Sequence, residues 1–251
     1  MAGHSKWAQI KRTKAKVDAE RGRLFSRLAK DIMTAARNGG PNPEANLRLK
    51  VAIERAREAN MPNENIQRAI LKGSGQLPGA KFEEVVYEGY GPGGVAIMME
   101  ALTDNRNRTA ADIRAIFNKC GGSLGESGSV SWMFQKKGII TVSRAENNIS
   151  EDDLLAIVLE AGAEDMQTSP EVFEITTAPE DLDKVLQALQ AQGVKVEEGK
   201  VALIPSTTVE VTGETAQKVL RLMEMLEEND DVQNVYANFE IPDSELAAME
   251  R

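Results

Sequence analysis

Apolar residues recur every three or four positions in several stretches of the first 75 residues, which predicts short amphipathic helices. The clearest apolar stripe spans residues 21–38, and the glycine pair that follows should end this helix. A second helix is expected from Pro43 with Asn42 as its cap, and a third with Asn63 as its cap. Three short helices joined by short loops predict a small helical domain.

From residue 76 the pattern changes to short apolar runs that alternate with helical segments. Strands are expected at 84–90 and 95–102, and SVSWMF reads as a further strand after a helix. Residues 137–205 have the order βαββαβ, which is typical of a ferredoxin-like domain. The last strand–helix–strand segment has no partner nearby in the sequence. We predict that it completes the βαβ unit of 94–134, because a sheet with only one βαβ half would leave an apolar face open.

These patterns predict an α+β protein in which an N-terminal three-helix domain precedes two ferredoxin-like α/β sandwich domains, one inserted in the other. The basic helical domain is expected at 1–75, with a mobile arm at 1–20. The central domain would combine 76–135 with 206–251, and residues 136–205 would form the inserted domain.

The charge of the chain is divided very unevenly. Residues 1–73 contain 16 of the 30 Lys and Arg residues but only 7 of the 39 Asp and Glu residues, a surplus of nine positive charges. The remaining residues contain 14 bases and 32 acids, which gives the whole chain its net charge of −9. A basic segment on an acidic body favours contact with nucleic acid, while the acidic part could face solvent or a protein partner.

The candidate nucleic-acid contacts are the cations of the arm and of the first helix, together with Trp7 and two arginines in TDNRNRT, at an expected helix N-terminus. They are Lys6, Trp7, Lys11, Arg12, Lys14, Lys16, Arg23, Arg27, Lys30, Arg37, Arg106 and Arg108. Arg48 and Arg55 of the second helix are expected near its outer side. A single tryptophan is a weak stacking signal, so we interpret Trp7 first as a packing anchor.

Two glycine-rich loops have simpler interpretations. GYGPGG at 89–94 lies between two expected strands and not before a helix, which favours a hairpin turn over a phosphate loop. GGSLGESGS at 121–129 connects a helix to a strand and could be a mobile contact loop. The helical pattern lacks a convincing helix-turn-helix, so sequence-specific base readout is not supported.

Catalytic chemistry finds little support. The one histidine, His4, lies in the arm, and Cys120 has no histidine near it in the sequence. No zinc-ligand spacing occurs, so neither a cofactor nor a metal is expected. A lone cysteine, no membrane-length apolar run and no signal-peptide pattern favour a cytoplasmic protein.

Three stretches carry a resemblance to a known family: MAGHSKWAQIKRTKAKVDAERGRLFSRLAKDI, GYGPGGVAIMMEALTDNRNRTAADIRAIF and the closing VYANFEI. They closely resemble the YebC/PmpR family, described as probable transcriptional regulators, with a mitochondrial branch that activates translation of a cytochrome oxidase subunit. The resemblance covers essentially the whole chain and implies three domains and no enzymatic activity. The start at MAGHSKW is similar to that of bacterial cytoplasmic members.

Two functions follow as hypotheses. The first is a DNA-binding transcriptional regulator, as the family description implies. The second is a ribosome-associated translation factor that binds ribosomal or transfer RNA and relieves stalling, for example at proline runs, as some members of the family imply. The lack of a helix-turn-helix favours the second on physical grounds. An enzyme is the weakest hypothesis, because no catalytic constellation is present.

Overall fold

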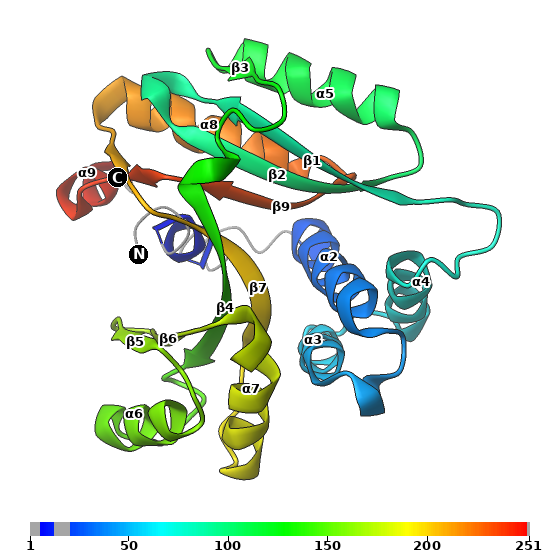
Figure 1. The fold of residues 1–251 in the computed structure, drawn as a ribbon, viewed down its shortest axis with the longest axis vertical. Helices are drawn as coiled ribbons and strands as arrows, with labels where there is room; N and C mark the ends of the chain where they lie inside the picture. Colours follow the sequence, from blue (N-terminus) through cyan, green and yellow to red (C-terminus); the bar gives the residue numbers. More distant parts are fainter. Residues whose placement is uncertain (1–5, 13–20, 250–251) are drawn as a thin grey trace. The chain divides into compact units, whose positions relative to one another are not determined.

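The computed structural model describes residues 6–12 and 21–249 and divides into two compact units. Unit 1 comprises Met1–Leu24, Gly79–Gln135 and Leu203–Arg251. Unit 2 comprises Phe25–Pro78 and Lys136–Ala202. The predicted α+β class is confirmed, since helices precede and alternate with two antiparallel sheets (Figure 1). The finer division into three domains stays a prediction.

The main sheet of unit 1 has the strand order β3-β1-β2-β9. Its strands are β1 (Glu83–Tyr90), β2 (Ala96–Thr103), β3 (Ser123–Leu124) and β9 (Val232–Ala237). β1 pairs with β2, and β9 lies antiparallel on the other side of β2. This pairing confirms the prediction that the C-terminal segment completes the sheet of the earlier strands.

Two helices cover one face of this sheet, α5 (Arg106–Lys119) and α8 (Gly213–Glu228) (Figure 1). Ile97 and Met99 of β2 meet Phe117 of α5 and Leu222 of α8 in the core. Alternate β2 residues supply this core because successive strand side chains point to opposite faces. A parallel pair of β8 (Val209–Glu210) and β10 (Phe239–Glu240), and the terminal helix α9 (Asp243–Met249), complete the unit.

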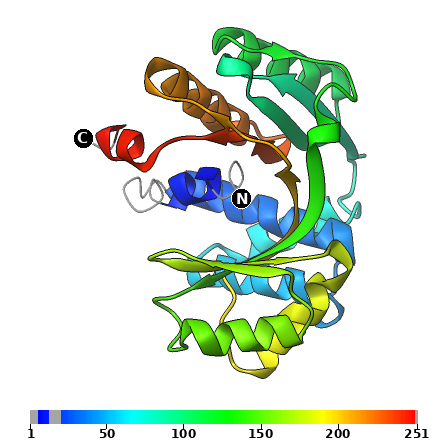
Figure 2. The same cartoon turned by 60° about the vertical axis from the view of Figure 1, so that its left-hand side comes forward.

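The α/β part of unit 2 has the predicted βαββαβ order and the strand order β5-β6-β4-β7. Its elements are β4 (Phe134–Ser143), α6 (Glu151–Glu160), β5 (Asp165–Thr168), β6 (Val172–Thr177), α7 (Leu182–Ala191) and β7 (Glu198–Pro205). α6 and α7 lie on one face of the sheet (Figure 2), and their leucines and valines form its core with alternate residues of β4 and β6.

The helical part of unit 2 contains α2 (Arg21–Gly39), α3 (Leu47–Glu58) and α4 (Asn63–Gly73), which share a core of their own. α4 ends against the backbone of Met33, and a side chain at Gly73 would collide with it, so glycine is needed there.

The starts of α3 and α4 correct the predicted caps. Asn42 caps only a short 3₁₀ helix, Pro43–Ala45, because its side chain accepts from the Glu44 amide. The cap of α3 is Asn46, and α4 begins at Asn63 itself after Pro62.

The segment SVSWMF, at 129–134, does not form the expected strand. Its middle forms a short 3₁₀ helix, Ser131–Met133, and β4 starts at Phe134 and runs into the second sheet. A second short 3₁₀ helix, Pro92–Gly94, occupies the expected β1–β2 turn, where Gly93 has a φ of 75°.

Residues 6–12 of the expected mobile arm are helical.

Asn46 ties the start of α3 to the end of α2. Its side-chain oxygen accepts from the Leu49 amide at 3.1 Å, and its amide nitrogen donates to the Ala35 and Gly40 carbonyls at 2.9 Å. The residue is buried, so each of these backbone groups would lose a partner without gaining water.

We therefore expect Asn46→Ala to lower the free energy of unfolding by about 2 kcal/mol. The matched change Asn42→Ala removes one exposed cap bond and should cost less than about 1 kcal/mol. Chemical denaturation of both variants, followed by circular dichroism, measures the difference. Equal losses would show that Asn46 acts only as an ordinary exposed cap.

Candidate nucleic-acid interface

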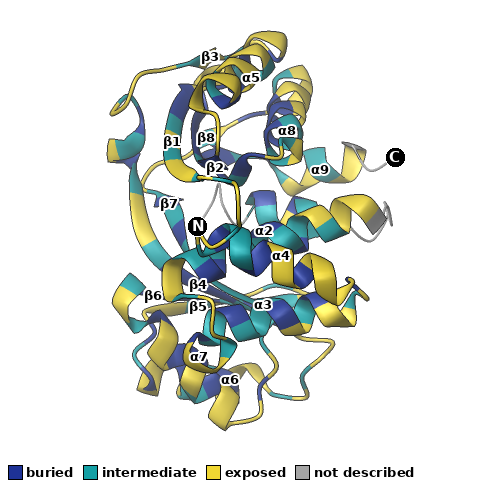
Figure 3. Cartoon of the chain, turned by 90° about the vertical axis from the view of Figure 1, so that its right-hand side faces the viewer, coloured by how far each residue is buried: buried dark blue, intermediate teal, exposed yellow. Residues whose placement is uncertain are grey.

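The cations of the helical part of unit 2 divide into those held by carboxylates and those that face solvent. α2, α3 and α4 each bury one face in a shared core and have exposed residues on their other faces (Figure 3). Lys50 and Arg57 are seven residues apart on α3 and therefore lie on the same side of that helix. Arg57 and Arg68, the latter on α4, are exposed.

Four cations of this part make no ion pair among the described residues: Arg27, Lys50, Arg57 and Arg68. We call them the open cations. Of these, the sequence analysis selected only Arg27. The signal that could have identified the others is their position outside the apolar stripes of α3 and α4.

The burial of Lys30 contradicts its selection as a nucleic-acid contact on the polar side of α2. Its residue is only 6% exposed, because its long aliphatic stem is covered by the surrounding structure. Arg27 and Arg37 are half-buried on the same helix. Lys30 is thus not available to a phosphate in this structure.

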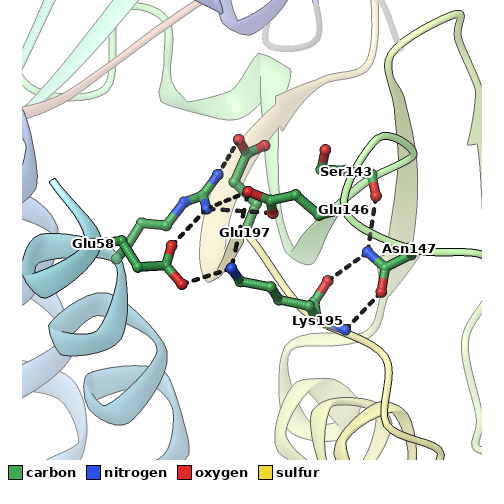
Figure 4. A network of polar contacts seen from close by, with 7 residues as sticks. Glu58, Ser143, Glu146, Asn147, Lys195 and Glu197 are labelled. Atoms are coloured by element: carbon green, nitrogen blue, oxygen red, sulfur yellow. Dashed lines mark hydrogen bonds and ion pairs between the residues drawn. The ribbon is translucent and has the colours of Figure 1, made fainter.

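Arg55 of α3 is the centre of a charge network with the α/β part of the same unit (Figure 4). Its guanidinium lies 2.6 Å from Glu197, 3.0 Å from Glu146 and 3.1 Å from Glu58, while Lys195 contacts Glu58 at 2.6 Å. Burial opposes the charge of Arg55, but the hydrogen bonds and charges of Glu146 and Glu197 outweigh burial and raise the guanidinium pKa. The hydrogen bond from Lys195 lowers the pKa of Glu58.

Arg48, also on α3, has a similar role. Its Nε lies 2.9 Å from Asp183 of α7, and its side chain is largely covered. The two arginines that were expected near the outer side of this helix therefore join the helical part to the α/β part within unit 2. Both serve the fold, because ion pairs in a partly buried setting are screened less than exposed pairs.

The N-terminal cations of unit 1 are held by carboxylates of α8 and α9. Lys6 lies 2.8 Å from Asp243, which lowers the pKa of that carboxyl. Lys11 lies 3.1 Å from Glu227. Arg23 approaches Glu228 at 3.4 Å and, at 3.7 Å, a second glutamate of α8. Arg12 is half-buried and Lys14 and Lys16 lie outside the described residues, so both lysines stay predictions.

Trp7 is a packing residue in this structure. Its side chain is 3% exposed within the core of unit 1, beside residues of α8, and its indole nitrogen donates to Glu227 at 3.0 Å. Lys11 lies over the ring at 5.9 Å. The packing interpretation that we preferred fits these contacts, and the ring has no free face for a base.

The two arginines at the start of α5 are also engaged. Arg108 lies 3.0 Å from both Asp231 and Asp104, and the hydrogen bonds that it donates to Asp231 and then to Asp104 raise its pKa. Arg106 approaches Glu83 at 3.6 Å. The helix start is closed by Asn105, whose side chain accepts from the Arg108 amide. This end of α5 therefore holds local carboxylates where a phosphate was expected.

Glu88 of β1 organises the glycine-rich loop at 121–129, which the sequence analysis interpreted as a helix-to-strand connection that could also be a mobile contact loop. Its buried carboxylate accepts from the backbone amides of Gly128 at 2.7 Å, Val130 at 3.0 Å and Ser131 at 2.7 Å. Burial alone would raise the carboxyl pKa, but these amide donors outweigh it and lower the pKa. The loop is tied to the sheet by an ionised carboxylate.

Other kinds of site are missing from the part of the chain that the structure describes. Residues 6–12 and 21–249 contain no group of three His, Cys, Asp or Glu side chains that could hold a metal ion. None of the helices in these ranges is long and apolar enough to cross a membrane. Cys120 is buried, with its sulfur 3.6 Å from that of Met225.

The two sheets and the basic helices α2, α3 and α4 define an α+β protein with a basic helical N-terminal segment. The family model for the TACO1/YebC protein N-terminal domain matches residues 5–76, and that for the TACO1/YebC second and third domain matches residues 82–239. The chain therefore belongs to the TACO1/YebC family.

Two relatives that share one name with each other, and one solved structure, are similar to this chain over most of its length. A "Probable transcriptional regulatory protein" of Pelotomaculum thermopropionicum is 59% identical, over 97% of this chain and 100% of its own length. Another from Symbiobacterium thermophilum is 60% identical, over 95% and 99%. The crystal structure of a conserved hypothetical protein from Aquifex aeolicus is 55% identical and matches with a TM-score of 0.79, over 91% of this chain and 94% of that one.

Arg55 and Arg57 provide a matched pair of tests on one helix. Arg55→Ala removes the partner of three carboxylates, so we expect the free energy of unfolding to fall by about 2 kcal/mol. Arg57→Ala removes an exposed cation and should change stability by less than about 0.5 kcal/mol. Chemical denaturation compares them. A similar stability for both variants would show that the network contributes little to folding.

Glu88 makes a pH-dependent contribution whose sign follows from its lowered pKa. The contribution is fully present above the unfolded pKa, about 4.5, and is lost as the pH falls through the lower folded pKa. At neutral pH, Glu88→Gln should cost about 1–3 kcal/mol. The difference between wild type and variant should shrink below about pH 4.5, as measured by denaturation across pH. A difference that does not change with pH would contradict the ionised clamp.

Proposed function

We propose that this protein is a non-enzymatic regulator that binds nucleic acid, and specifically a transcriptional regulator that contacts DNA in the cytoplasm. The names of its relatives, which describe probable transcriptional regulatory proteins, support the regulatory role. The observation that carries the nucleic-acid contact is the set of open cations on α2, α3 and α4, which remain after the internal ion pairs are taken into account. Lys and Arg on an exposed face neutralise phosphates and release condensed counterions.

The location of these cations favours contact with the sugar–phosphate backbone. Arg57 and Arg68 are exposed on two neighbouring helices of one compact core, and Lys50 shares the side of Arg57. Contacts of this kind position a protein on a duplex but carry no sequence information. The proposed regulator therefore binds with little sequence preference through this face, and its affinity depends strongly on salt.

Internal ion pairs leave fewer cations for a nucleic-acid interface than the sequence analysis selected. Lys6, Lys11 and Arg23 face carboxylates of α8 and α9, so a phosphate would have to displace those carboxylates first. Displacing a partly covered ion pair loses its attraction before any new contact is made. We therefore place the primary contact on the open cations and not on the N-terminal segment.

The test is charge reversal on the open cations. Arg57→Glu with Arg68→Glu should weaken binding to a labelled DNA duplex more than tenfold, and should flatten the slope of log affinity against log salt by about two units. Both side chains are exposed, so the fold should be retained. Fluorescence anisotropy across a salt series measures both quantities.

The matched control is Lys218→Glu with Arg221→Glu, which makes the same change in net charge on exposed positions of the acidic helix α8. It should leave the salt slope unchanged. A folded Arg57/Arg68 variant that binds with the wild-type slope would overturn the assignment of the interface. Running the same series with an RNA hairpin identifies the target class, because a clear preference for RNA would replace the transcriptional role with a translational one.

A further inference from the structure

Trp132 is the most exposed of the large hydrophobic residues in the part of the chain that the structure describes. It is 73% exposed and lies in the short 3₁₀ helix Ser131–Met133, just after the glycine-rich loop. The sequence analysis placed it inside a strand. Its indole offers a large apolar ring surface of the kind that contact sites use.

The exposed ring is held in a defined position. Trp132 Nε1 donates to the Ser129 carbonyl at 3.1 Å, and the Tyr90 hydroxyl donates to the same carbonyl at 3.3 Å. Tyr90 is 37% exposed. Because the polar atoms of both side chains are already used, the surfaces they offer to solvent are mainly ring carbon.

The backbone beneath these rings is fixed by Glu88. Its carboxylate binds the amides of residues on both sides of Ser129, namely Gly128, Val130 and Ser131. The neighbouring strand β3 pairs with β1, with Ser123 opposite Tyr90. Trp132 therefore follows a loop that is bonded to the sheet, and Tyr90 is the last residue of β1, so little entropy is lost when the two rings engage a partner.

Residues 106–135 contain four bases and two acids. Two of these bases, Arg106 and Arg108, are held by carboxylates outside this range. Exposed Arg114 and Lys119 lie on α5, and Lys119 ends that helix four residues before Ser123, the partner of Tyr90. Trp132 thus follows a helix that offers two exposed cations, Arg114 and Lys119, to a polyanion.

We propose that Trp132, supported by Tyr90, forms a stacking platform for an unpaired nucleobase of single-stranded nucleic acid, with Lys119 and Arg114 near the phosphates. The proposal rests on the proposed nucleic-acid function and names a substrate class for it. Every base offers a π face, and an indole whose N–H is occupied cannot read base edges, so the platform accepts any base. A protein partner with an aromatic pocket is the competing class, and the tests below separate the two.

The first test compares Trp132→Ala with wild type on a fluorescein-labelled single-stranded oligonucleotide and on the blunt duplex of the same sequence. The variant should lose about 5- to 100-fold in affinity for the single strand, the effect typical of removing one stacked base. Duplex affinity and the salt slope should not change, because the residue carries no charge. Leu159→Ala, an equally simple loss of an exposed apolar residue on α6, should behave as wild type.

The second test uses tryptophan emission and needs no loss of binding. The single strand should quench the emission of wild type, and Trp132→Phe should abolish the quenching, because the remaining Trp7 is buried. Wild-type single-strand affinity in Trp132→Ala, or quenching that persists in Trp132→Phe, overturns the proposal.

The two proposals fail in different ways. If wild type binds neither single strand nor duplex, the proposed function itself is wrong. If wild type binds both and Trp132→Ala binds both equally well, only the stacking platform is wrong. A Trp132→Ala variant that keeps single-strand affinity but loses a protein partner in pull-down experiments overturns the platform in favour of a protein-docking surface.

Discussion

Internal neutralisation of charge is the constraint on which this structure depends. The chain joins a basic N-terminal third to an acidic remainder. Within each compact unit, cations of the N-terminal third form ion pairs with carboxylates of the remainder. In unit 2, Arg55 binds three glutamates and Arg48 binds an aspartate of α7. In unit 1, Lys6 and Lys11 meet α9 and α8. Both partners are mostly covered in the pairs Lys11–Glu227 and Arg55–Glu197. Removing one partner there leaves a charge that water solvates poorly.

The same pairing determines what remains for function. Cations that hold the fold together are poor phosphate ligands, because each is already neutralised and partly desolvated. The open cations on α2, α3 and α4 are therefore a small remnant of a large basic surplus. The platform at Trp132 offers a different chemistry. Charge contacts weaken as salt rises, whereas stacking does not, so the two surfaces would discriminate among nucleic acids in different ways.

Much of the fold follows from local pattern. α2 lies within a residue of its predicted limits, because amphipathic periodicity and terminal glycines are encoded locally. The pairing of β9 with β2 was predictable because an unpaired apolar sheet face is unstable. SVSWMF was mispredicted because its apolar residues alternate as in a strand. Its amides are instead bonded by Glu88, more than forty residues earlier in the chain.

The sequence by itself determined the family, the α+β class, the division of charge and the positions of most helices, because each of these depends on composition or on neighbours a few residues apart. Only the tertiary structure decided which cations are neutralised and which tryptophan is exposed. Trp7 and Trp132 both lie in polar stretches, yet one is buried against α8 and the other faces solvent. That difference depends on contacts such as Trp7 with Glu227, between residues more than two hundred positions apart, which no local pattern contains.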